Sequence, residues 1–235
     1  MRWQEPFMQV LDAVKSEAEV LEVLVTAVLE LGFEYCAFGM RWPLPVIRPA
    51  MSIIANYPES WRKRYLEKNY VACDPTVAHG LTSQQALVWS DQVFAAAPAL
   101  WDDARDHGLR VGVAQSAYNA RGVAGLLTVS RSHEPVGDAE LRKHAPHLWW
   151  LSQAALDAMT RVTLQNGRAE ANICLTAREV EVLRWSADGK TANDIAEIIQ
   201  ISERTVSFHI NNALLKLGTA NKTAGVIKAA LLRLL

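Results

Sequence analysis

The chain has 235 residues, of which 50% are hydrophobic and 21% are charged, and its formal net charge is −1. This length is enough for two domains that each bury a core, and the near-zero net charge excludes a protein that is basic over its whole surface. No segment approaches the roughly 20 consecutive apolar residues of a membrane-spanning helix, and the N-terminus lacks the apolar segment of a signal peptide, so we expect a cytoplasmic protein.

The first two thirds of the chain mix helical and strand patterns. Apolar residues recur at helical spacing over 8–31, which predicts one helix there. The other predicted elements, in chain order, are strands over 33–42 and 51–58, a short helix over 59–70, strands over 109–118 and 123–131, and a long helix over 138–164. This order predicts an α/β/α sandwich around an antiparallel sheet, and we place this domain at 1–164.

A change of composition marks a second domain. Residues 165–173 are mostly polar and contain a glycine, which is typical of a linker. After them the pattern predicts only helices, over 176–187, 192–199, 203–217 and 222–235. This all-α domain, 174–235, has eight basic and six acidic residues, whereas the rest of the chain is net acidic. The difference has the sign expected if only the C-terminal domain binds a polyanion.

The cysteines and the acidic run DDARD do not predict a metal site. Cys36, Cys73 and Cys174 are far apart and lack CxxC spacing, so we expect free thiols rather than disulfides or a zinc site. The run DDARD (102–106) has the DDxxD spacing of some magnesium sites, but no second acidic cluster accompanies it. We interpret it as the exposed face of a helix.

The C-terminal pattern predicts a helix-turn-helix. Thr176 and Glu179 have the spacing of a capping box, and Ser202 is suited to cap the helix over 203–217. A short helix, a tight turn and a longer helix follow one another, and the longer helix has a polar strip that includes Asn211. Such a strip can be ordinary solvated surface, or it can reach base edges in the major groove.

The runs LTAREVEVLRWSADGKT (175–191) and IAEIIQISERTVSFHINNALLKLGTANKTA (195–224) resemble the DNA-binding signature of LuxR-type bacterial transcription regulators. The resemblance implies that Glu179, Leu183 and Gly189 are chiefly structural. It implies contacts with double-stranded DNA, with base readers at Ser207, Phe208 and Asn211. The implied phosphate contacts are Lys190, Thr191, Arg204, Lys216 and Lys222.

An aromatic-rich segment predicts a ligand pocket in the first domain. In YPESWRKRYLEKNYVACD (57–74), Trp61 and Tyr65 are four residues apart and therefore share a helix face. Aromatic side chains around a single carboxylate, Asp74, are typical of an apolar pocket with a few directional polar groups. Aromatic residues at this spacing are more often core residues, however, and Asp74 before Pro75 could instead cap a turn.

The same family resemblance extends to residues 1–165, where it points to the acyl-homoserine-lactone-binding domain. The matching positions are Trp61, Tyr65, Asp74, Pro75, Trp89 and Gly112. The resemblance implies that Asp74 accepts the ligand amide N–H and that Trp61 donates to the lactone carbonyl. It implies that Tyr57, helped by Ser130, donates to the amide carbonyl. The residues implied to pack on the lactone ring or border the acyl tail are Trp89, Trp101, Tyr65 and Arg41.

Ala37 stands where some relatives carry a hydroxyl residue, so the preference for a 3-oxo group stays open. We expect Asp74 to lack a hydrogen-bond donor when the pocket is empty, and ligand binding to complete the core and hold a homodimer on a pseudo-palindromic operator. Contacts with RNA polymerase are implied by the resemblance alone.

Three other functions compete with this one. A lactone-degrading enzyme is not favoured, since no nucleophile elbow, metal spacing or Ser/His/Asp arrangement is present in the sequence. A two-component response regulator would need an acidic phosphoacceptor pattern that the N-terminal half lacks. A ligand-independent or orphan LuxR-type regulator that senses a molecule other than a lactone stays open.

Overall fold

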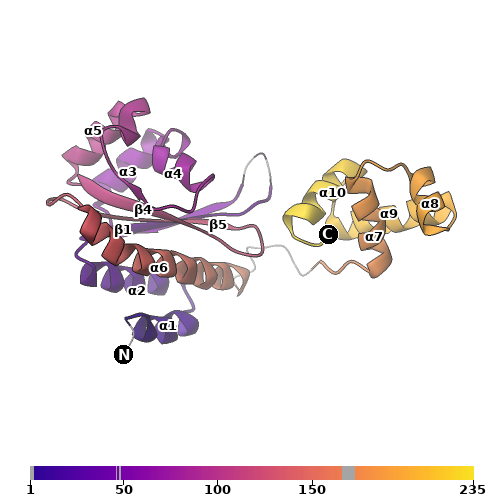
Figure 1. Cartoon of the computed structure of the whole chain (residues 1–235), viewed down its shortest axis with the longest axis horizontal. Coiled ribbons are helices and arrows are strands. Elements are labelled where there is room, and N and C mark those ends of the chain that lie inside the picture. Colours follow the sequence, from indigo (N-terminus) through magenta and orange to yellow (C-terminus); the bar gives the residue numbers. More distant parts are fainter. Residues whose placement is uncertain (1–2, 46, 48, 166–172) are drawn as a thin grey trace. The chain divides into compact units, whose positions relative to one another are not determined.

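The computed structural model describes residues 3–45, 47, 49–165 and 173–235. These residues form two compact units, one that combines a sheet with helices and one that is helical (Figure 1). Of the predicted linker 165–173, Gln165 ends the last helix of the first unit, and 166–172 lie outside the described residues. Each unit is described by itself.

The N-terminal domain contains a mixed set of helices and strands. Its helices are α1 (Gln4–Ala13), α2 (Glu17–Glu30), α3 (Glu59–Glu67), α4 (Pro75–Gly80), α5 (Pro98–Asp106) and α6 (Asp138–Gln165). Its strands are β1 (Tyr35–Arg41), β2 (Met51–Ala55), β3 (Leu87–Val88), β4 (Val111–Tyr118) and β5 (Ala124–Arg131). Short 3₁₀ turns follow α3 and β3, at Tyr70–Ala72 and Val93–Ala96.

The strands of the described chain form one antiparallel sheet with the order β2-β1-β5-β4-β3. The helices α2 and α6 cover one face, and α3, α4 and α5 lie over the other (Figure 1). The predicted α/β/α sandwich is therefore confirmed. β1 is the strand that links distant parts of the sequence, because it pairs with β2 on one side and with β5 on the other.

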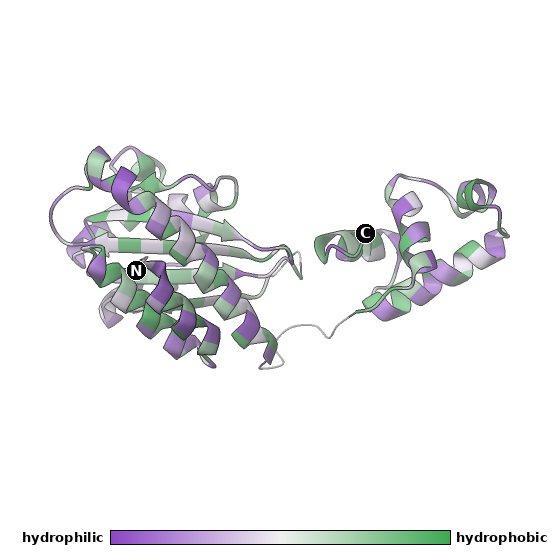
Figure 2. Cartoon of the chain, turned by 60° about the horizontal axis from the view of Figure 1, so that its bottom comes forward, coloured by the Kyte–Doolittle hydropathy of each residue, from purple (hydrophilic) through white to green (hydrophobic). Residues whose placement is uncertain are grey.

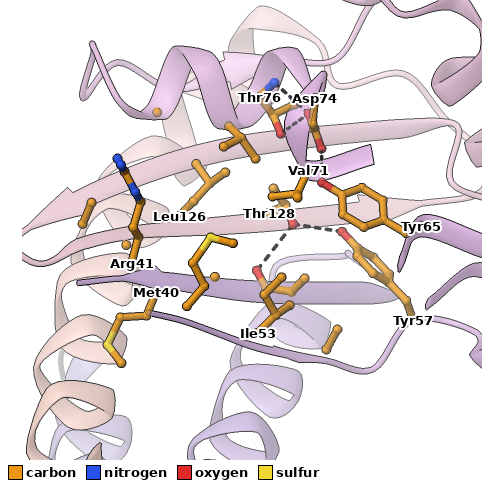
Figure 3. Close-up of a pocket in the computed structure, with 18 of the residues that line it drawn as sticks. Met40, Arg41, Ile53, Tyr57, Tyr65, Val71, Asp74, Thr76, Leu126 and Thr128 are labelled. Atoms are coloured by element: carbon orange, nitrogen blue, oxygen red, sulfur yellow. Dashed lines mark hydrogen bonds between the residues drawn. The ribbon is translucent and has the colours of Figure 1, made fainter. Parts of the chain in front are cut away.

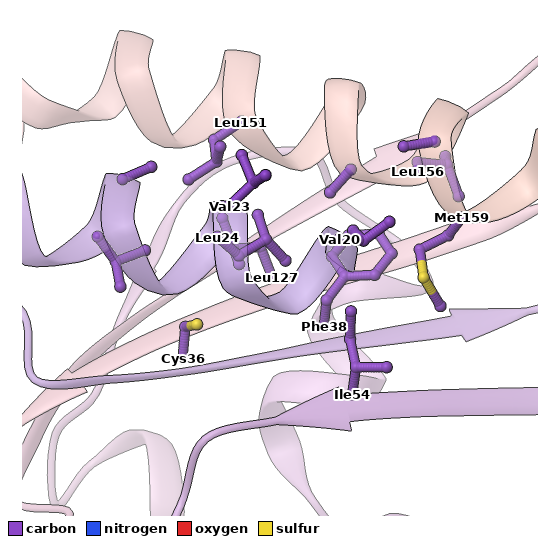
Figure 4. Close-up of a cluster of buried hydrophobic side chains, with 14 of the residues drawn as sticks. Val20, Val23, Leu24, Cys36, Phe38, Ile54, Leu127, Leu151, Leu156 and Met159 are labelled. Atoms are coloured by element: carbon purple, nitrogen blue, oxygen red, sulfur yellow. The ribbon is translucent and has the colours of Figure 1, made fainter. Parts of the chain in front are cut away.

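The main hydrophobic core lies between the sheet and the helices α2 and α6. Alternate residues of a strand point to opposite faces, so Cys36 and Phe38 of β1 and Leu127 of β5 reach this core. They meet Leu24 of α2 and Leu156 of α6, and all five are buried (Figure 4). The helices of this domain carry both hydrophobic and hydrophilic residues along their length, as expected for helices that cover a sheet (Figure 2).

The prediction of a single helix over 8–31 was wrong, because the chain forms α1 and α2 with a break between them. Val14 is extended, with ψ of 144°. The Ser16 hydroxyl accepts a hydrogen bond from the Glu19 amide, and the Glu19 carboxylate accepts one from the Lys15 amide. These local bonds start a new helix at Glu17, and apolar spacing alone does not reveal them.

The region between β2 and β4 also differs from the prediction. The helix predicted over 59–70 ends at Glu67, and a left-handed residue, Asn69, precedes the 3₁₀ turn. The strand predicted over 51–58 ends at Ala55. The short elements α4, α5 and β3 were not predicted, since six- to nine-residue helices and a two-residue strand carry little periodic signal.

In the C-terminal domain the predicted helices are confirmed as α7 (Ala177–Ala187), α8 (Ala192–Ile199), α9 (Glu203–Leu217) and α10 (Lys222–Leu231), although α10 ends before residue 235. Each helix starts at a side-chain cap. The caps are Thr176, Thr191, Ser202 and Asn221. The helices α7, α8 and α9 pack around a small core that includes Val182, Ile195, Val206 and Ile210.

Within the described ranges, every helix is too short or too polar to cross a lipid bilayer. Among the same residues, no group of three or more His, Cys, Asp or Glu side chains is arranged to hold a metal ion.

Candidate functional site

A pocket of about 320 Å³ lies between the sheet and the helices α3 and α4, on the face away from the main core (Figure 3). Its floor comes from β1, β2 and β5, whose alternate residues point away from α2 and α6. Its roof comes from α3, the 3₁₀ turn and α4, with Trp89 at one side. Apolar side chains dominate the lining, most of the polar groups gather at the end that holds Asp74, and Arg41 lies at the other end.

Asp74 is the centre of the polar end. Its Oδ1 accepts hydrogen bonds from the Thr76 amide at 2.8 Å and from the Thr76 hydroxyl at 2.7 Å. Its Oδ2 accepts one from the Tyr65 hydroxyl at 2.9 Å. The expectation that Asp74 lacks a donor in the empty pocket was therefore wrong. The alternative that Asp74 caps a turn is confirmed, because it is the N-cap of α4.

Two tyrosines at the polar end remain protonated donors. The Tyr57 hydroxyl lies 3.0 Å from the Thr128 hydroxyl, which in turn donates to the Ala37 carbonyl at 3.4 Å. Burial raises the pKa of Tyr57. Burial, and then the charge of Asp74, raises the pKa of Tyr65. Both phenols therefore keep their proton at neutral pH and can donate a hydrogen bond.

Two donors next to this end have no acceptor among the described residues. Ser130 follows Thr128 on the same face of β5, and its buried Oγ lacks a hydrogen-bond partner. The indole Nε1 of Trp89 is also buried and unpartnered. The Trp89 ring lies against Gly112 of β4, where a Cβ atom would come within 2.6 Å of the ring. A glycine at position 112 is therefore needed for the Trp89 ring to lie against β4.

Trp61 of α3 is buried and lies at the pocket wall. Its ring stacks on Tyr70 at 6.2 Å and meets Tyr65 edge-on at 5.6 Å. Tyr70 is held in turn by Asp103 of α5, because its hydroxyl donates to Asp103 Oδ2, which also accepts from Arg64 Nε at 2.6 Å. The Arg64 guanidinium and then the Tyr70 hydroxyl lower the pKa of Asp103.

This network corrects the interpretation of DDARD as an exposed helix face. Asp102 and Asp106 are exposed, as expected. Asp103 is not, because it joins α5 to α3 and to the 3₁₀ turn behind Trp61. Sequence spacing gave no sign of this role, since the partners come from a different helix.

The structure brings most of the predicted ligand residues to the pocket. Those that line it are Arg41, Tyr57, Trp61, Tyr65, Asp74 and Trp89. Trp101 and Ser130 do not line it. The Trp101 indole donates to Asp91 at 2.6 Å, and its ring stacks on Phe94 at 4.5 Å, so it supports Trp89 from behind. Ser130 lies beneath the polar end.

Several lining residues were not predicted. They include Thr76, Thr128, Gly39, Ile53 and Leu126. The alternation of side chains along β1, β2 and β5 could have indicated the strand members, once the face that packs on the long helices was assigned. Thr76 could have been suspected from its position two residues after Asp74, where a capped helix begins.

The predicted DNA-binding residues are divided between α9 and the start of α8. On α9, Arg204, Ser207, Phe208 and Asn211 follow helical spacing and form a strip that is open to solvent, with Phe208 60% exposed. The opposite side of α9 carries the buried core residues. Thr191 caps α8 by accepting a hydrogen bond from the Asp194 amide, and Lys190 beside it is exposed.

Two of the predicted phosphate contacts have partners within the domain. Lys216 Nζ donates to Glu179 Oε2 at 2.7 Å, and the same oxygen accepts from the Thr176 amide at 2.8 Å. Burial opposes ionisation of Glu179, but Lys216 and the Thr176 amide outweigh it and lower the pKa of Glu179. Lys222 Nζ donates to the Lys190 carbonyl at 3.1 Å. Lys216 therefore ties α9 to α7, in agreement with a structural role for Glu179.

Comparison with known proteins assigns both domains. Residues 16–159 match the family described as autoinducer binding domain. Residues 174–229 match the bacterial regulatory proteins of the luxR family. The chain is 40% identical over 235 residues to the transcriptional activator protein AnoR of Acinetobacter nosocomialis, covering 99% of each chain. It is 34% identical to the quorum-sensing regulator RhlR of Pseudomonas aeruginosa, covering 99% of this chain and 96% of that protein.

Solved structures agree with this assignment. The crystal structure of Escherichia coli SdiA matches with a TM-score of 0.82 at 33% identity, covering 99% of this chain and 97% of that one. A structure of SdiA in complex with octanoyl-rac-glycerol matches with a TM-score of 0.79 at 34% identity, covering 98% and 94%. The chain therefore belongs to the LuxR family of bacterial transcriptional regulators, a non-enzymatic family, and joins an autoinducer-binding domain to a helix-turn-helix DNA-binding domain.

Proposed function

We propose that this quorum-sensing regulator of transcription binds an N-acyl-homoserine lactone through the polar end of its N-terminal pocket, and that occupancy makes the helix-turn-helix domain competent to hold a promoter. The observation that carries the proposal is the layout of the pocket. Directional polar groups stand at one end, around Asp74, and an apolar channel leads away from them. An acyl-homoserine lactone has the matching layout, with an amide and a lactone at one end of an alkyl chain.

Asp74 has the capacity to accept the ligand amide N–H. A carboxylate offers about four acceptor positions, and Tyr65 and Thr76 fill three of them. The position that is left accepts the amide. The internal donors also fix the rotamer of Asp74, so the ligand meets a carboxylate that is already oriented.

Tyr57 and Ser130 are suited to donate to the amide carbonyl. Ser130 has a buried hydroxyl without a partner among the described residues, and Tyr57 lies nearby on the same side of the sheet. A buried donor left unpaired costs about 1–3 kcal/mol, so an incoming carbonyl is favoured at this place. The buried ring of Trp61 lies at the pocket wall, and its indole N–H donates to the lactone carbonyl. The ring of Trp89 packs on the lactone.

Occupancy is expected to act by mass action. A ligand that binds only the folded pocket stabilises the N-terminal domain, which then holds a homodimer. Two copies of α9 related by a two-fold axis bind a pseudo-palindromic operator, with half-sites about one helical turn apart. Base reading is assigned to Ser207, Phe208 and Asn211. Bacterial promoter DNA lies in the cytoplasm, so we expect the protein to act there. RNA polymerase is then a further partner of the promoter-bound regulator.

The test is to identify what the protein carries. The full chain is produced with and without a mixture of acyl-homoserine lactones, and the compound that copurifies is identified by mass spectrometry. Operator binding by the two preparations is then compared by fluorescence anisotropy. A copurified lactone and lactone-dependent operator binding are expected. An empty protein that binds its operator equally well would contradict the proposal.

A second ligand class is favoured by one observation. SdiA, which is 34% identical, was solved in complex with octanoyl-rac-glycerol, an acyl ester without an amide. The carbonyl donors Tyr57 and Ser130 suit an ester as well as an amide, whereas Asp74 then needs a hydroxyl donor. Mass spectrometry separates the two classes, because a monoacylglycerol and a lactone differ in mass and in fragmentation.

A further inference from the structure

The floor of the pocket is a regular grid, because three paired strands present alternate residues to it. β1 pairs with β2 on one side and with β5 on the other, so every second residue of β1 stands between two pocket-facing neighbours. The grid has three rows. From the polar end they are Ala55–Ala37–Thr128, Ile53–Gly39–Leu126 and Met51–Arg41–Ala124.

The first and last rows mark the two ends of the channel. Thr128 in the first row lies 3.0 Å from the Tyr57 hydroxyl, so the ligand carbonyl stands over this row. Arg41 in the third row lies at the opposite end of the pocket from Tyr57 and Tyr65 (Figure 3). Its guanidinium is the point where an apolar chain stops gaining apolar contacts.

Gly39, at the centre of the grid, leaves the channel open. A Cβ atom added there would meet no other atom within 4 Å, so it would project into free space above the floor. The other pocket glycines differ, since a Cβ at Gly80 or Gly125 would collide with Leu126 or Phe38 at 2.8 Å or less. The backbone of Gly39 has an ordinary strand conformation, so the backbone does not require glycine there. The role of the missing side chain is to leave room in the channel.

The spacing of the rows gives a length. The four steps from Ala37 to Arg41 span about 13 Å at 3.3 Å per residue. An extended chain advances about 1.2 Å per bond, since three backbone bonds cover about 3.5 Å. An acyl chain that starts over the first row therefore reaches the third row with about ten to twelve carbons.

The apolar lip of the pocket agrees with a chain of this length. Met51 and Ile53 on the floor are 54% and 51% exposed, and Leu66 and Leu81 on the roof are 72% and 44% exposed. A butanoyl chain ends before the second row and leaves these side chains in water. A chain that reaches the third row covers the floor members and contacts the roof members.

We infer that Gly39 and Arg41 are specificity-determining residues, and that they select an unbranched acyl chain of about ten to twelve carbons. Gly39 keeps the middle of the channel open, and Arg41 ends it. The inference rests on the proposed binding of an acyl-homoserine lactone in the same pocket, and it adds the class of acyl chain.

The test measures the affinity of the full chain for butanoyl-, octanoyl-, dodecanoyl- and tetradecanoyl-homoserine lactone. A methylene that becomes fully buried tightens binding about fourfold, and a methylene in a half-exposed channel tightens it about twofold. Affinity is expected to rise on the order of 100-fold from butanoyl to dodecanoyl, with no further gain for tetradecanoyl. Equal affinity for butanoyl and dodecanoyl in the parent would overturn the inference while leaving the proposed function intact. Failure of every lactone to bind would overturn both.

Two variants test which residues determine the preferred length of the acyl chain. Gly39→Val is expected to weaken dodecanoyl binding at least about tenfold by overfilling the second row, and to change butanoyl binding less than about threefold. Arg41→Leu is expected to strengthen tetradecanoyl binding about threefold, because the channel then continues past the third row. Gly137→Val is the matched control, since a Cβ at Gly137 also meets nothing within 4 Å and lies outside the pocket.

Circular dichroism and the unfolding midpoint show whether each variant is folded. Arg41→Leu leaves the strand pairing intact, so it tests the inference even if Gly39→Val does not fold. An equal loss of butanoyl and dodecanoyl binding in folded Gly39→Val, or no change in tetradecanoyl binding in Arg41→Leu, would overturn the assigned roles.

Discussion

The two domains build their binding surfaces in opposite ways. The pocket is assembled from β1, β2, β5, α3 and α4. Gly39 and Leu126 are neighbours on the pocket floor but are far apart in the sequence. The strip on α9 belongs to a single helix, whose cap and core contacts lie within the same small domain. The pocket therefore depends on the packing of the whole N-terminal domain, whereas the strip is complete within its own. Under the proposed function, a ligand therefore has no need to reshape α9 and would regulate by controlling how two copies of this helix are presented.

The largest change in lactone affinity is expected from Asp74→Asn. The amide has fewer acceptor positions than the carboxylate, so it cannot serve Tyr65, Thr76 and the ligand amide together. Hydrogen bonds to a charged group contribute about 1.5–3 kcal/mol, and we expect lactone affinity to fall on the order of 10-fold to 100-fold in titration calorimetry. Operator binding should then require correspondingly more lactone.

The control for this change is Asp102→Asn, because Asp102 is exposed and lies outside the pocket. It should leave lactone affinity unchanged. If Asp74→Asn dimerises and binds the operator without lactone as well as the parent does with it, the coupling between the two domains is refuted.

The same contrast explains what the sequence could predict. The helices α7 to α10 were located from local signals, such as Thr176 with Glu179 and Ser202 before α9. These signals lie within four residues of the element they define. The fold class of the N-terminal domain was also predictable, since the hydrophobic patterns of β4, β5 and α6 are long and regular.

The parts that were missed depend on contacts between distant residues. Asp103 has the same local context as Asp102, and only the fold brings Arg64 and Tyr70 to it. The donors that fill the acceptor positions of Asp74 depend on where α3 ends and α4 begins, and α4 has only six residues. The predicted ligand residues follow from the family resemblance, but the place of Gly39 on the pocket floor follows only from the register of β1 with its neighbours.

A second change tests whether the DNA-binding domain is self-contained. Glu179→Ala removes a buried carboxylate that joins α7 to α9 through Lys216, and should lower the free energy of unfolding of this domain by about 2 kcal/mol. Hydrogen exchange is expected to rise in α7 and α9. Lactone affinity should stay unchanged. A loss of lactone affinity would mean that the pocket depends on the folding of the C-terminal domain.

The pKa of Glu179 gives this prediction a pH dependence. Its pKa in the folded domain lies below the ordinary value of 4.5. The carboxylate therefore contributes stability above about pH 4.5, and this contribution is lost as the pH falls through the lower folded value. The difference in unfolding free energy between the parent and Glu179→Ala should narrow on acidification below pH 4.5.

A smaller effect is expected from Asn211→Ala on the exposed strip. A good base contact contributes about 1–3 kcal/mol, so operator affinity should fall about tenfold, and affinity for random DNA much less. Fluorescence anisotropy with both DNAs at one salt concentration measures the ratio. Asn212→Ala is the matched control, because Asn212 is one residue along α9 and faces a different direction. An equal loss on both DNAs would remove Asn211 from base reading.

The smallest effect is expected from Asp103→Asn, which tests whether the pocket wall depends on contacts from α5. Asp103 supports Tyr70, and Tyr70 stacks on Trp61, so the change reaches the ligand only through two packed side chains. We expect lactone affinity to fall about threefold, with the greater loss in ligands that keep the lactone carbonyl, the proposed acceptor of the Trp61 indole N–H. An N-cyclopentyl amide of the same acyl chain, whose ring lacks the carbonyl, provides the comparison ligand.

The pKa of Asp103 determines the pH range in which the parent and Asp103→Asn differ. Arg64 and Tyr70 lower its pKa below the ordinary 3.8, so the carboxylate stays ionised in the folded protein at the pH of a binding assay. The contribution of the ionised group to stability is present above about pH 3.8 and is lost as the pH falls through the lower folded value. The parent and Asp103→Asn should therefore differ at neutral pH, and the difference should narrow as the pH falls below 3.8. If the affinity of Asp103→Asn equals that of the parent at neutral pH, Tyr70 and Trp61 are held by packing alone, and α5 has no part in placing the pocket wall.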